Sequence, residues 1–218
     1  EDIEKKAKEI SDETYIAATD TTADYDEETH TVTLTLGTPG RIVEADTITK
    51  AVDNAFSSLD FSDITLDYDK VEIDTGAVRR LANQCAQDYG SEPVEPQVTA
   101  DSENHTIEVT MGTPGYTLDP GALYDAAKQQ VESGDYGTVS QEMTEVLPTD
   151  VDITDAYHEL ACDPTEPYYA GGDVQEGYDG YTLDWDAAVA DIMNTGWGDT
   201  VSIAMTAVPP EKTADEIR

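Results

Sequence analysis

The chain contains one eleven-residue phrase twice. Residues 30–40 read HTVTLTLGTPG and residues 105–115 read HTIEVTMGTPG, at an offset of 105 − 30 = 75 residues, with 7 of the 11 paired positions identical. A third, weaker copy repeats the GYTLD of 115–119 at 180–184. Because each copy of a repeat must be one supersecondary unit, the sequence predicts about three related repeats. We place them at 1–73, 74–149 and 150–218.

Each repeat reads as helix, strand, strand, turn, helix and strand. In the middle repeat, apolar residues recur at helical spacing between Asp74, a candidate N-cap, and Gly90, a candidate helix stop. Alternation typical of strands follows at 98–100 and 107–111, with a hairpin turn predicted at 101–104.

The second half of each repeat begins with a capped helix and ends with a strand. Asp119 precedes Pro120, which is a favoured pairing at a helix start. The closing strand is predicted at 138–148, and its counterparts at 64–72 and 200–210. Since each closing strand leads directly into the next helix, we expect neighbouring repeats to share a sheet.

The last repeat offers Thr154 and Asp184 as caps of its two helices. The pattern as a whole predicts an α+β fold of repeated helix–strand–strand–helix–strand units, with helices packed on antiparallel or mixed sheets. Short linkers favour packed units over beads on a flexible string.

A G-x-x-G step recurs in every repeat, where a strand gives way to a helix. Pro in the first two copies presets φ for a turn, and Gly tolerates φ > 0. We therefore expect positive φ at the second glycine of at least two copies. The six structural turn glycines are Gly37, Gly40, Gly112, Gly115, Gly177 and Gly180.

Composition excludes several function classes. The net charge is −37, from 48 acidic and 11 basic residues. Nucleic acid needs clustered Lys and Arg to neutralise phosphates, and anionic membrane surfaces need them too, so neither is an expected partner. No segment is apolar over 18 residues. The chain begins abruptly inside a charged, helix-like segment, which suggests that flanking parts of a longer protein precede it.

Catalytic and metal-binding patterns are not expected. Cys85 and Cys162 lack the spacing of a zinc site, and near helix ends both are predicted to be buried apolar residues. His158 lies four residues before Cys162, but no oxyanion site accompanies this pair. With no Walker A loop, Rossmann fingerprint or HExxH motif, we predict a protein that is no enzyme and uses no cofactor or metal.

Two polar features favour solvated turns over metal sites. An acidic cluster lies in the first hairpin, and calcium binding is its alternative reading, although the EF-hand spacing is lacking. Its members are Asp20, Asp24, Asp26, Glu27 and Glu28. His30 and His105 share one repeat position, at the start of a strand, and we read both as hairpin-end histidines.

Aromatic residues gather in the last repeat. Glycans are commonly bound by stacking on exposed aromatic faces, so the candidate ligand-binding residues are Tyr168, Tyr169, Tyr178 and Trp197. Trp197, between two glycines, is the best candidate for exposure. The alternative is that the neighbouring Tyr181 and Trp185 simply fill a small core.

The repeat resembles the peptidoglycan-binding domain of the YoaR-like family, which is found upstream of VanW-type domains and of some L,D-transpeptidases in Gram-positive bacteria. The residues that carry the resemblance are Gly112, Gly115, Tyr116, Leu118 and Asp119, with Gly177, Gly180, Tyr181, Leu183 and Asp184 in the third copy. The tail VPPEKTADEIR at 208–218 resembles a junction into a VanW-type domain. These motifs are structural, and no binding residues are carried over.

The resemblance implies a non-catalytic, extracellular module of a cell-envelope protein at the cell surface, with a membrane anchor and a C-terminal domain elsewhere in the full-length protein. We expect it to bind peptidoglycan or another cell-wall glycan. The alternative is a structural spacer that projects a VanW-like or other C-terminal domain from the membrane. The charge requires any contact with an anionic wall to be short-range, through stacking, hydrogen bonds or bridging cations.

Overall fold

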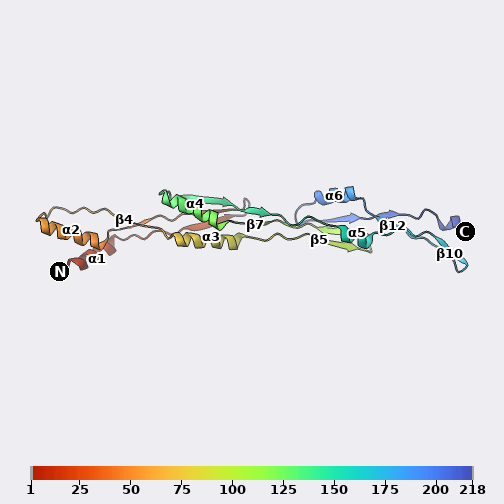
Figure 1. Cartoon of the computed structure of the whole chain (residues 1–218), viewed down its shortest axis with the longest axis horizontal. Helices are drawn as coiled ribbons and strands as arrows, with labels where there is room; N and C mark the ends of the chain where they lie inside the picture. Colours follow the sequence, from red (N-terminus) through yellow and green to blue (C-terminus); the bar gives the residue numbers. More distant parts are fainter. Residues whose placement is uncertain (1, 218) are drawn as a thin grey trace. The chain divides into compact units, whose positions relative to one another are not determined.

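The computed structural model of the chain describes residues 2–217 (Figure 1). The fold is α+β, as the sequence predicted, with helices beside small antiparallel sheets. Two compact units are present. Unit 1 consists of Glu1–Gly90 and Thr117–Thr144, and unit 2 consists of Ser91–Tyr116 and Glu145–Arg218.

Unit 1 contains four helices and a three-stranded sheet among its described residues. The helices are α1 (Ile3–Thr14), α2 (Ala45–Ser58), α3 (Thr75–Tyr89) and α4 (Pro120–Glu132). The sheet has the order β1 (Thr22–Asp26), β2 (Thr31–Thr35) and β8 (Thr138–Glu142). A separate pair joins β3 (Gly40–Ile42) to β4 (Asp69–Val71).

Unit 2 repeats this arrangement and adds a short hairpin. Its helices are α5 (Thr154–Leu160), α6 (Trp185–Met193) and α7 (Ala214–Ile217). Its three-stranded sheet has the order β13 (Thr200–Ala204), β6 (Thr106–Thr110) and β5 (Gln97–Asp101). Two pairs join β12 (Gly180–Thr182) to β14 (Thr206–Val208), and β10 (Tyr168–Ala170) to β11 (Asp173–Gln175). The remaining two-stranded sheet is β7 (Gly115–Thr117) with β9 (Thr144–Val146).

Each repeat contributes a strand to the sheet of the repeat before it. The β1–β2 hairpin of the first repeat is completed by β8 of the second, with Val32 opposite Gln141. The β5–β6 hairpin of the second repeat is completed by β13 of the third, with Ile107 opposite Ile203. The expectation that neighbouring repeats share a sheet is confirmed. The compact units are therefore offset from the sequence repeats 1–73, 74–149 and 150–218.

Alternation along the central strands explains why these sheets form. In β2 the side chains of Val32 and Leu34 are fully buried, while the alternating threonines 31, 33 and 35 lie on the other face. In β6 the same positions are Ile107 and Val109, also fully buried. A central strand of β-branched and aliphatic residues with period two suits a sheet that is covered on one face.

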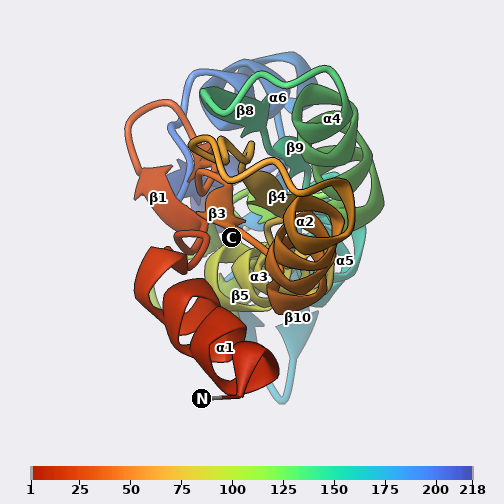
Figure 2. The same ribbon diagram turned by 90° about the vertical axis from the view of Figure 1, so that its left-hand side faces the viewer.

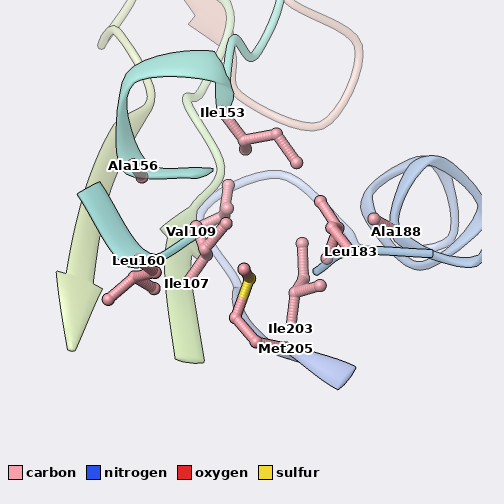
Figure 3. Close-up of a cluster of buried hydrophobic side chains, with 9 residues drawn as sticks. All are labelled: Ile107, Val109, Ile153, Ala156, Leu160, Leu183, Ala188, Ile203 and Met205. Carbon is pink, nitrogen blue, oxygen red and sulfur yellow. The ribbon is translucent and has the colours of Figure 1, made fainter. Parts of the chain in front are cut away.

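The core of unit 2 lies between its sheet and its helices. Side chains from α5, β6 and the region of β13 meet those from the start of α6 in Figure 3. The buried members are Ile107, Val109, Ile153, Ala156, Leu160, Leu183, Ala188, Ile203 and Met205. In unit 1 the corresponding elements bury Val32, Leu34, Val78, Ala82, Cys85, Leu123, Ala127 and Val131.

The β1–β2 and β5–β6 hairpins each end in a histidine with left-handed backbone. His30 has φ 48° and His105 has φ 50°. Both histidines therefore lie at hairpin ends, as predicted. Their carbonyl oxygens accept hydrogen bonds from the amides of Met143 and Met205, each 2.9 Å long. These bonds tie the hairpin end to the strand that completes the sheet.

The predicted closing strands are shorter than expected. The segment 138–148 divides into β8 and β9, and 200–210 divides into β13 and β14. The break falls at Met143 and at Met205, where the amide bonds to the hairpin-end histidine and the side chain is buried. The prediction for 64–72 was also wrong over most of its length, because only Asp69–Val71 forms a strand there.

Aspartate caps begin three of the helices, as predicted. Asp74, Asp119 and Asp184 each accept a hydrogen bond from backbone amides of the first helical turn. The prediction for Thr154 was wrong. Thr154 is the first residue of α5, and its amide donates to Asp152 Oδ1 at 2.9 Å.

The G-x-x-G glycines do not adopt positive φ. The glycines with positive φ among the described residues lie elsewhere, at 134, 171, 172 and 198, so this expectation was wrong. Their role is close approach to another backbone segment. A Cβ on Gly40 would lie 2.6 Å from the carbonyl carbon of Ala17, and one on Gly115 would lie 2.6 Å from that of Glu92. The G-x-x-G segment bridges to the stretch after the preceding helix, and a side chain at these positions would separate the two.

Candidate functional site

The loop that follows α6 holds Trp197 in place. Gly198 has φ 76°, which turns the chain sharply after the tryptophan. The Gly198 amide donates to the Gly112 carbonyl at 3.1 Å, and the Met111 amide donates to the Asp199 carbonyl at 2.8 Å. These two backbone bonds, directly after the indole, therefore fix the loop to the end of β6.

Trp197 lines a groove of about 460 Å³ that belongs entirely to unit 2. Met193 and Trp197 line it from the end of α6 and the following loop, and Leu147 lines it from the segment after β9. The exposed fractions of these side chains are 80% for Met193, 60% for Leu147 and 52% for Trp197. The volume is in the range of small-molecule sites, which are mostly apolar with a few polar groups.

Polar groups complete the groove. Thr149, Asp150 and Thr195 are among its lining residues. The Thr149 amide donates to Glu95 Oε2 at 2.9 Å, and its hydroxyl donates to the same oxygen. These bonds lower the pKa of Glu95, chiefly through the Thr149 hydroxyl, and they fix the 147–151 segment that forms one wall. An exposed indole beside hydroxyl and carboxylate groups is chemically suited to a sugar ring.

The corresponding loop of unit 1 has a different arrangement. There the aromatic residue is Tyr136, whose hydroxyl oxygen is buried and whose ring centroid lies 5.3 Å from Lys70 Nζ. The pKa of Lys70 is raised, first by the Tyr136 hydroxyl and then by the carboxylate of Glu72. An outward-facing aromatic at this loop is thus a property of unit 2 and not of the repeat itself.

The three candidate tyrosines lie away from this groove. Tyr168 and Tyr169 are on β10, and Tyr178 follows β11, with exposed fractions of 56%, 66% and 72%. None of them lines the groove. Figure 1 shows β10 well separated from α6 within unit 2. The structure therefore does not bring the four candidate ligand-binding residues together, and Trp197 stands apart from the tyrosines.

The neighbouring aromatics have mainly structural roles. Tyr181 packs against the core of unit 2, and its ring stacks on His105 with centroids 3.7 Å apart. Trp185 is 42% exposed and meets Tyr157 edge to face at 5.0 Å. Tyr181 thus packs against the core, as the alternative interpretation of the sequence proposed, while Trp185 is only partly buried.

The acidic hairpin forms a hydrogen-bonded turn. Asp26 Oδ1 accepts from the amides of Glu28 at 2.9 Å and Thr29 at 3.3 Å, which lowers the pKa of Asp26. Within residues 2–217, no group of three or more His, Cys, Asp or Glu side chains is arranged to hold a metal ion.

The two cysteines differ. Cys85 is buried on α3, whereas Cys162 is exposed just beyond the end of α5, so the prediction of burial was wrong for Cys162. Both are free thiols. Cys162 lies outside the helix because its backbone has left it to bridge Tyr181. His158 and Cys162 therefore do not share a helix face.

Sequence reasoning missed the apolar wall of the groove. Leu147 directly follows β9 and Met193 is the last residue of α6, so each lies at the end of a periodic segment. The available signal was in α6, where the apolar residues continue to Met193 although Ala188 is the residue that the helix buries.

The described helices include none with the length and apolar character needed to cross a membrane. No family model, curated protein or solved structure matches this chain.

Proposed function

We propose that unit 2 binds a glycan in the Trp197 groove and that the chain is a non-catalytic extracellular module of a cell-envelope protein. Peptidoglycan is the glycan class that the resemblance of the repeats implies. The observation that supports this proposal is a half-exposed indole at the wall of a groove of about 460 Å³, on a loop tied by backbone hydrogen bonds to the end of β6. A sugar ring would stack on the indole and direct its hydroxyl groups to Asp150 and to the carbonyls of the groove.

Charge shapes how such binding would respond to salt. The net charge of −37 repels an anionic cell wall over long range. Salt screens that repulsion over about 8–10 Å at physiological ionic strength, whereas stacking and hydrogen bonds act at contact. Retention on a wall glycan should therefore hold steady or rise between low and moderate salt, which is opposite to the behaviour of a basic, charge-driven binder.

The test is retention of the purified chain on insoluble peptidoglycan, with and without calcium. Trp197→Ala should weaken retention several-fold, since a stacked aromatic contributes on the order of 1 kcal/mol. Tyr178→Ala is the control, because Tyr178 is also an exposed aromatic residue but lies outside the groove. Equal losses in both variants, or no retention of the wild type at moderate salt, would refute the groove as the site.

A structural spacer is the second candidate. The observation that favours it is that each three-stranded sheet takes strands from two successive repeats, so the repeats are joined by backbone pairing. The spacer proposal predicts no glycan retention under any condition, with unfolding unaffected by wall fragments.

A further inference from the structure

Strand β5 forms one edge of the three-stranded sheet of unit 2. It pairs with β6 on one side, and no strand within residues 2–217 pairs with its other side. The Met205 amide donates to the His105 carbonyl, which shows that the odd-numbered residues of β6 bond to β13 and the even-numbered ones to β5. Val98 and Ala100 lie opposite odd-numbered residues of β6. Their backbone N–H and C=O groups therefore point away from the sheet.

A groove of about 510 Å³ lies at this edge. Residues 98–100 of β5 form one side of it, and α5 with the residues just before it forms the other. Figure 1 shows α5 beside β5 within unit 2. All the lining residues belong to unit 2. The groove thus combines backbone groups that can pair with a strand and side chains that can select it.

The helix side of the groove carries three carboxylates. Asp152, Asp155 and Glu159 line it, and all three are exposed. Asp152 accepts the Thr154 amide at 2.9 Å. Among the described residues, neither Asp155 nor Glu159 forms an ion pair. No Lys, Arg or His lines the groove, and His158 on the same helix is not part of its wall. The side chains of an occupant that face α5 should therefore be cationic.

Unit 1, which Figure 2 views from the end where α1 and α2 lie, differs at the corresponding place. There Tyr25 of β1 stacks on Tyr89, the last residue of α3, with ring centroids 4.5 Å apart. Ala100 takes the position of Tyr25 in unit 2 (25 + 75 = 100). Leu160 takes that of Tyr89, because the bridge after the helix lies 71 residues later in unit 2 (162 − 91 = 71). Two aromatic rings join helix and edge strand in unit 1, whereas smaller side chains leave a groove in unit 2.

We propose that the β5 edge binds an extended, lysine- or arginine-rich segment of a partner protein, which adds to the sheet as a fourth strand. The added strand exchanges backbone hydrogen bonds with Val98 and Ala100, the mode by which peptides extend exposed sheet edges. This site is independent of the glycan groove, because the two share no lining residue.

The geometry also defines the pattern of the bound segment. Val98 and Ala100 pack against the core, on the face of the sheet that α5 covers. In an antiparallel pair, residues directly opposite each other point to the same face. Partner residues opposite Val98 and Ala100 therefore lie beside Asp155 and Glu159. The segment should carry a basic residue at every second position, with the residues between them facing solvent.

Overall charge makes a control for specificity necessary. The sequence of unit 2 contains 2 Lys or Arg residues, Lys212 and Arg218, and the net charge of the chain is −37. Any basic peptide is attracted to such a surface over long range, and salt weakens that attraction. Affinity for the proposed segment should fall as salt rises, which is opposite to the expectation for glycan retention. The decisive tests must therefore change backbone bonding or charge position at constant total charge.

The first test varies the peptide. The probe is a fluorescein-labelled peptide of about nine alternating lysine and threonine residues, a usual strand length, and fluorescence anisotropy measures its binding to the full chain. N-methylation of the lysine amides removes the bonds to Val98 and Ala100, so it should weaken binding about tenfold or more. N-methylation of the threonine amides should have little effect, because these face away from β5. Equal affinity of the two methylated peptides would exclude strand addition.

The second test moves the lost charge. Asp155→Asn with Glu159→Gln removes the two carboxylates without an ion pair, and it should weaken binding of the unmodified peptide about tenfold. Asp186→Asn with Asp191→Asn is the control, because it removes two exposed carboxylates from α6, outside the groove. All four side chains are exposed, so both variants should fold. Equal losses in the two variants would show that the peptide responds to total charge alone.

A third variant blocks the edge itself. Ala100→Pro removes an amide that points away from the sheet, a position where an edge strand tolerates proline. Circular dichroism checks the fold. The folded variant should lose peptide binding and keep the glycan retention of the wild type, whereas Trp197→Ala should bind the peptide normally. Peptide binding that survives Ala100→Pro, or no binding by the wild type at about 0.05 M salt, where screening is weak, would overturn the proposal and leave the glycan groove untouched.

Discussion

The hydroxyl oxygens of Thr33 and Ser140 lie 2.8 Å apart, although 107 residues separate them in sequence. In unit 2 the hydroxyl oxygens of Thr110 and Thr200 make a similar cross-strand contact at 2.9 Å, across 90 residues. These contacts lie on the outer face of each sheet, behind the strand pairs that build the two cores. A buried side chain in one repeat is therefore held by elements of the next.

The first prediction concerns this shared core. Leu34 is fully buried in β2, so Leu34→Ala should lower the free energy of unfolding by about 2–5 kcal/mol. Thr33→Ala, its outward-facing neighbour, should cost about 1 kcal/mol, the value of one exposed hydrogen bond at most. Urea unfolding measures both. A cost below 1 kcal/mol for Leu34→Ala would show that β8 does not cover this position.

A second prediction separates two reasons for a glycine. Gly115→Ala should destabilise by about 3 kcal/mol, because its Cβ would meet the backbone of 91–93 and disturb the paired bonds between Ser91 and Tyr116. Gly134→Ala has open space around it but φ 80°, so its cost should be about 1 kcal/mol, from backbone strain alone. If the two substitutions cost the same, crowding is not what selects Gly115.

A third prediction concerns Trp197 and stability. Because the indole is half-exposed, Trp197→Ala should cost about 1 kcal/mol or less. Leu123→Ala, which removes a fully buried side chain, should cost about 2–5 kcal/mol. Thermal unfolding of the two variants distinguishes a surface platform from a core residue. An unfolded Trp197→Ala would contradict the surface location.

The fourth prediction is a pH dependence at the second hairpin. Hydrogen bonds from the Asn104 side chain and amide, and from the Glu103 amide, lower the pKa of Asp101 from its ordinary value of 3.8. A lowered pKa in the folded state contributes stability that is present above 3.8 and is lost as pH falls through the folded-state pKa. Asp101→Asn should therefore melt at a lower temperature than the wild type at pH 6, and the gap should close below about pH 3.8.

Asn104→Ala checks the cause. This substitution removes the largest of the interactions that lower the pKa of Asp101. In the Asn104→Ala background, the melting temperatures with Asp101 and with Asp101→Asn should therefore differ less at pH 6 than they do in the wild-type background. A gap between wild type and Asp101→Asn that stays constant from pH 6 to pH 2 would mean that the carboxylate charge plays no part in the turn.

The fifth prediction concerns thiol reactivity. Burial raises the pKa of Cys85, and the charge of Asp88 adds to this effect. Since the thiolate is the reactive form, Cys85 should resist a thiol reagent until the protein unfolds. Cys162 is exposed and should react at once. Native Cys162→Ser should show no fast-reacting thiol, and a fast phase that persists in it would contradict the burial of Cys85.

The local elements were largely predictable from the sequence, because helix caps, strand alternation and turns depend on only a few neighbouring residues. Asp119 before Pro120 predicts a helix wherever it occurs, and the alternation around Ile107 predicts a strand. The conformation of Gly115 was not predictable, because a glycine can be required by positive φ or by crowding. Sequence letters do not distinguish these two causes.

The site was predictable only in part. Glycines on both sides of Trp197 correctly indicated an exposed indole. The prediction that Trp197 lies beside Tyr168 and Tyr169 was wrong. The tyrosines are on β10, whereas Trp197 follows α6, and the strands and helix between them place these residues apart. The groove walls could not be foreseen, since 147–151 and the end of α6 meet only through tertiary packing.

Because β8 completes a sheet that begins with β1 and β2, the first hairpin must wait for its third strand during synthesis. A ribosome adding about 5–20 residues per second would complete β8 roughly 5–20 s after β2, given the 107 residues between Thr33 and Ser140. During that interval the nascent hairpin exposes one unpaired edge together with Val32 and Leu34. The acidic turn at Asp26, Glu27 and Glu28 lies at the tip of this hairpin. Its charge would keep waiting hairpins on neighbouring nascent chains from pairing edge to edge.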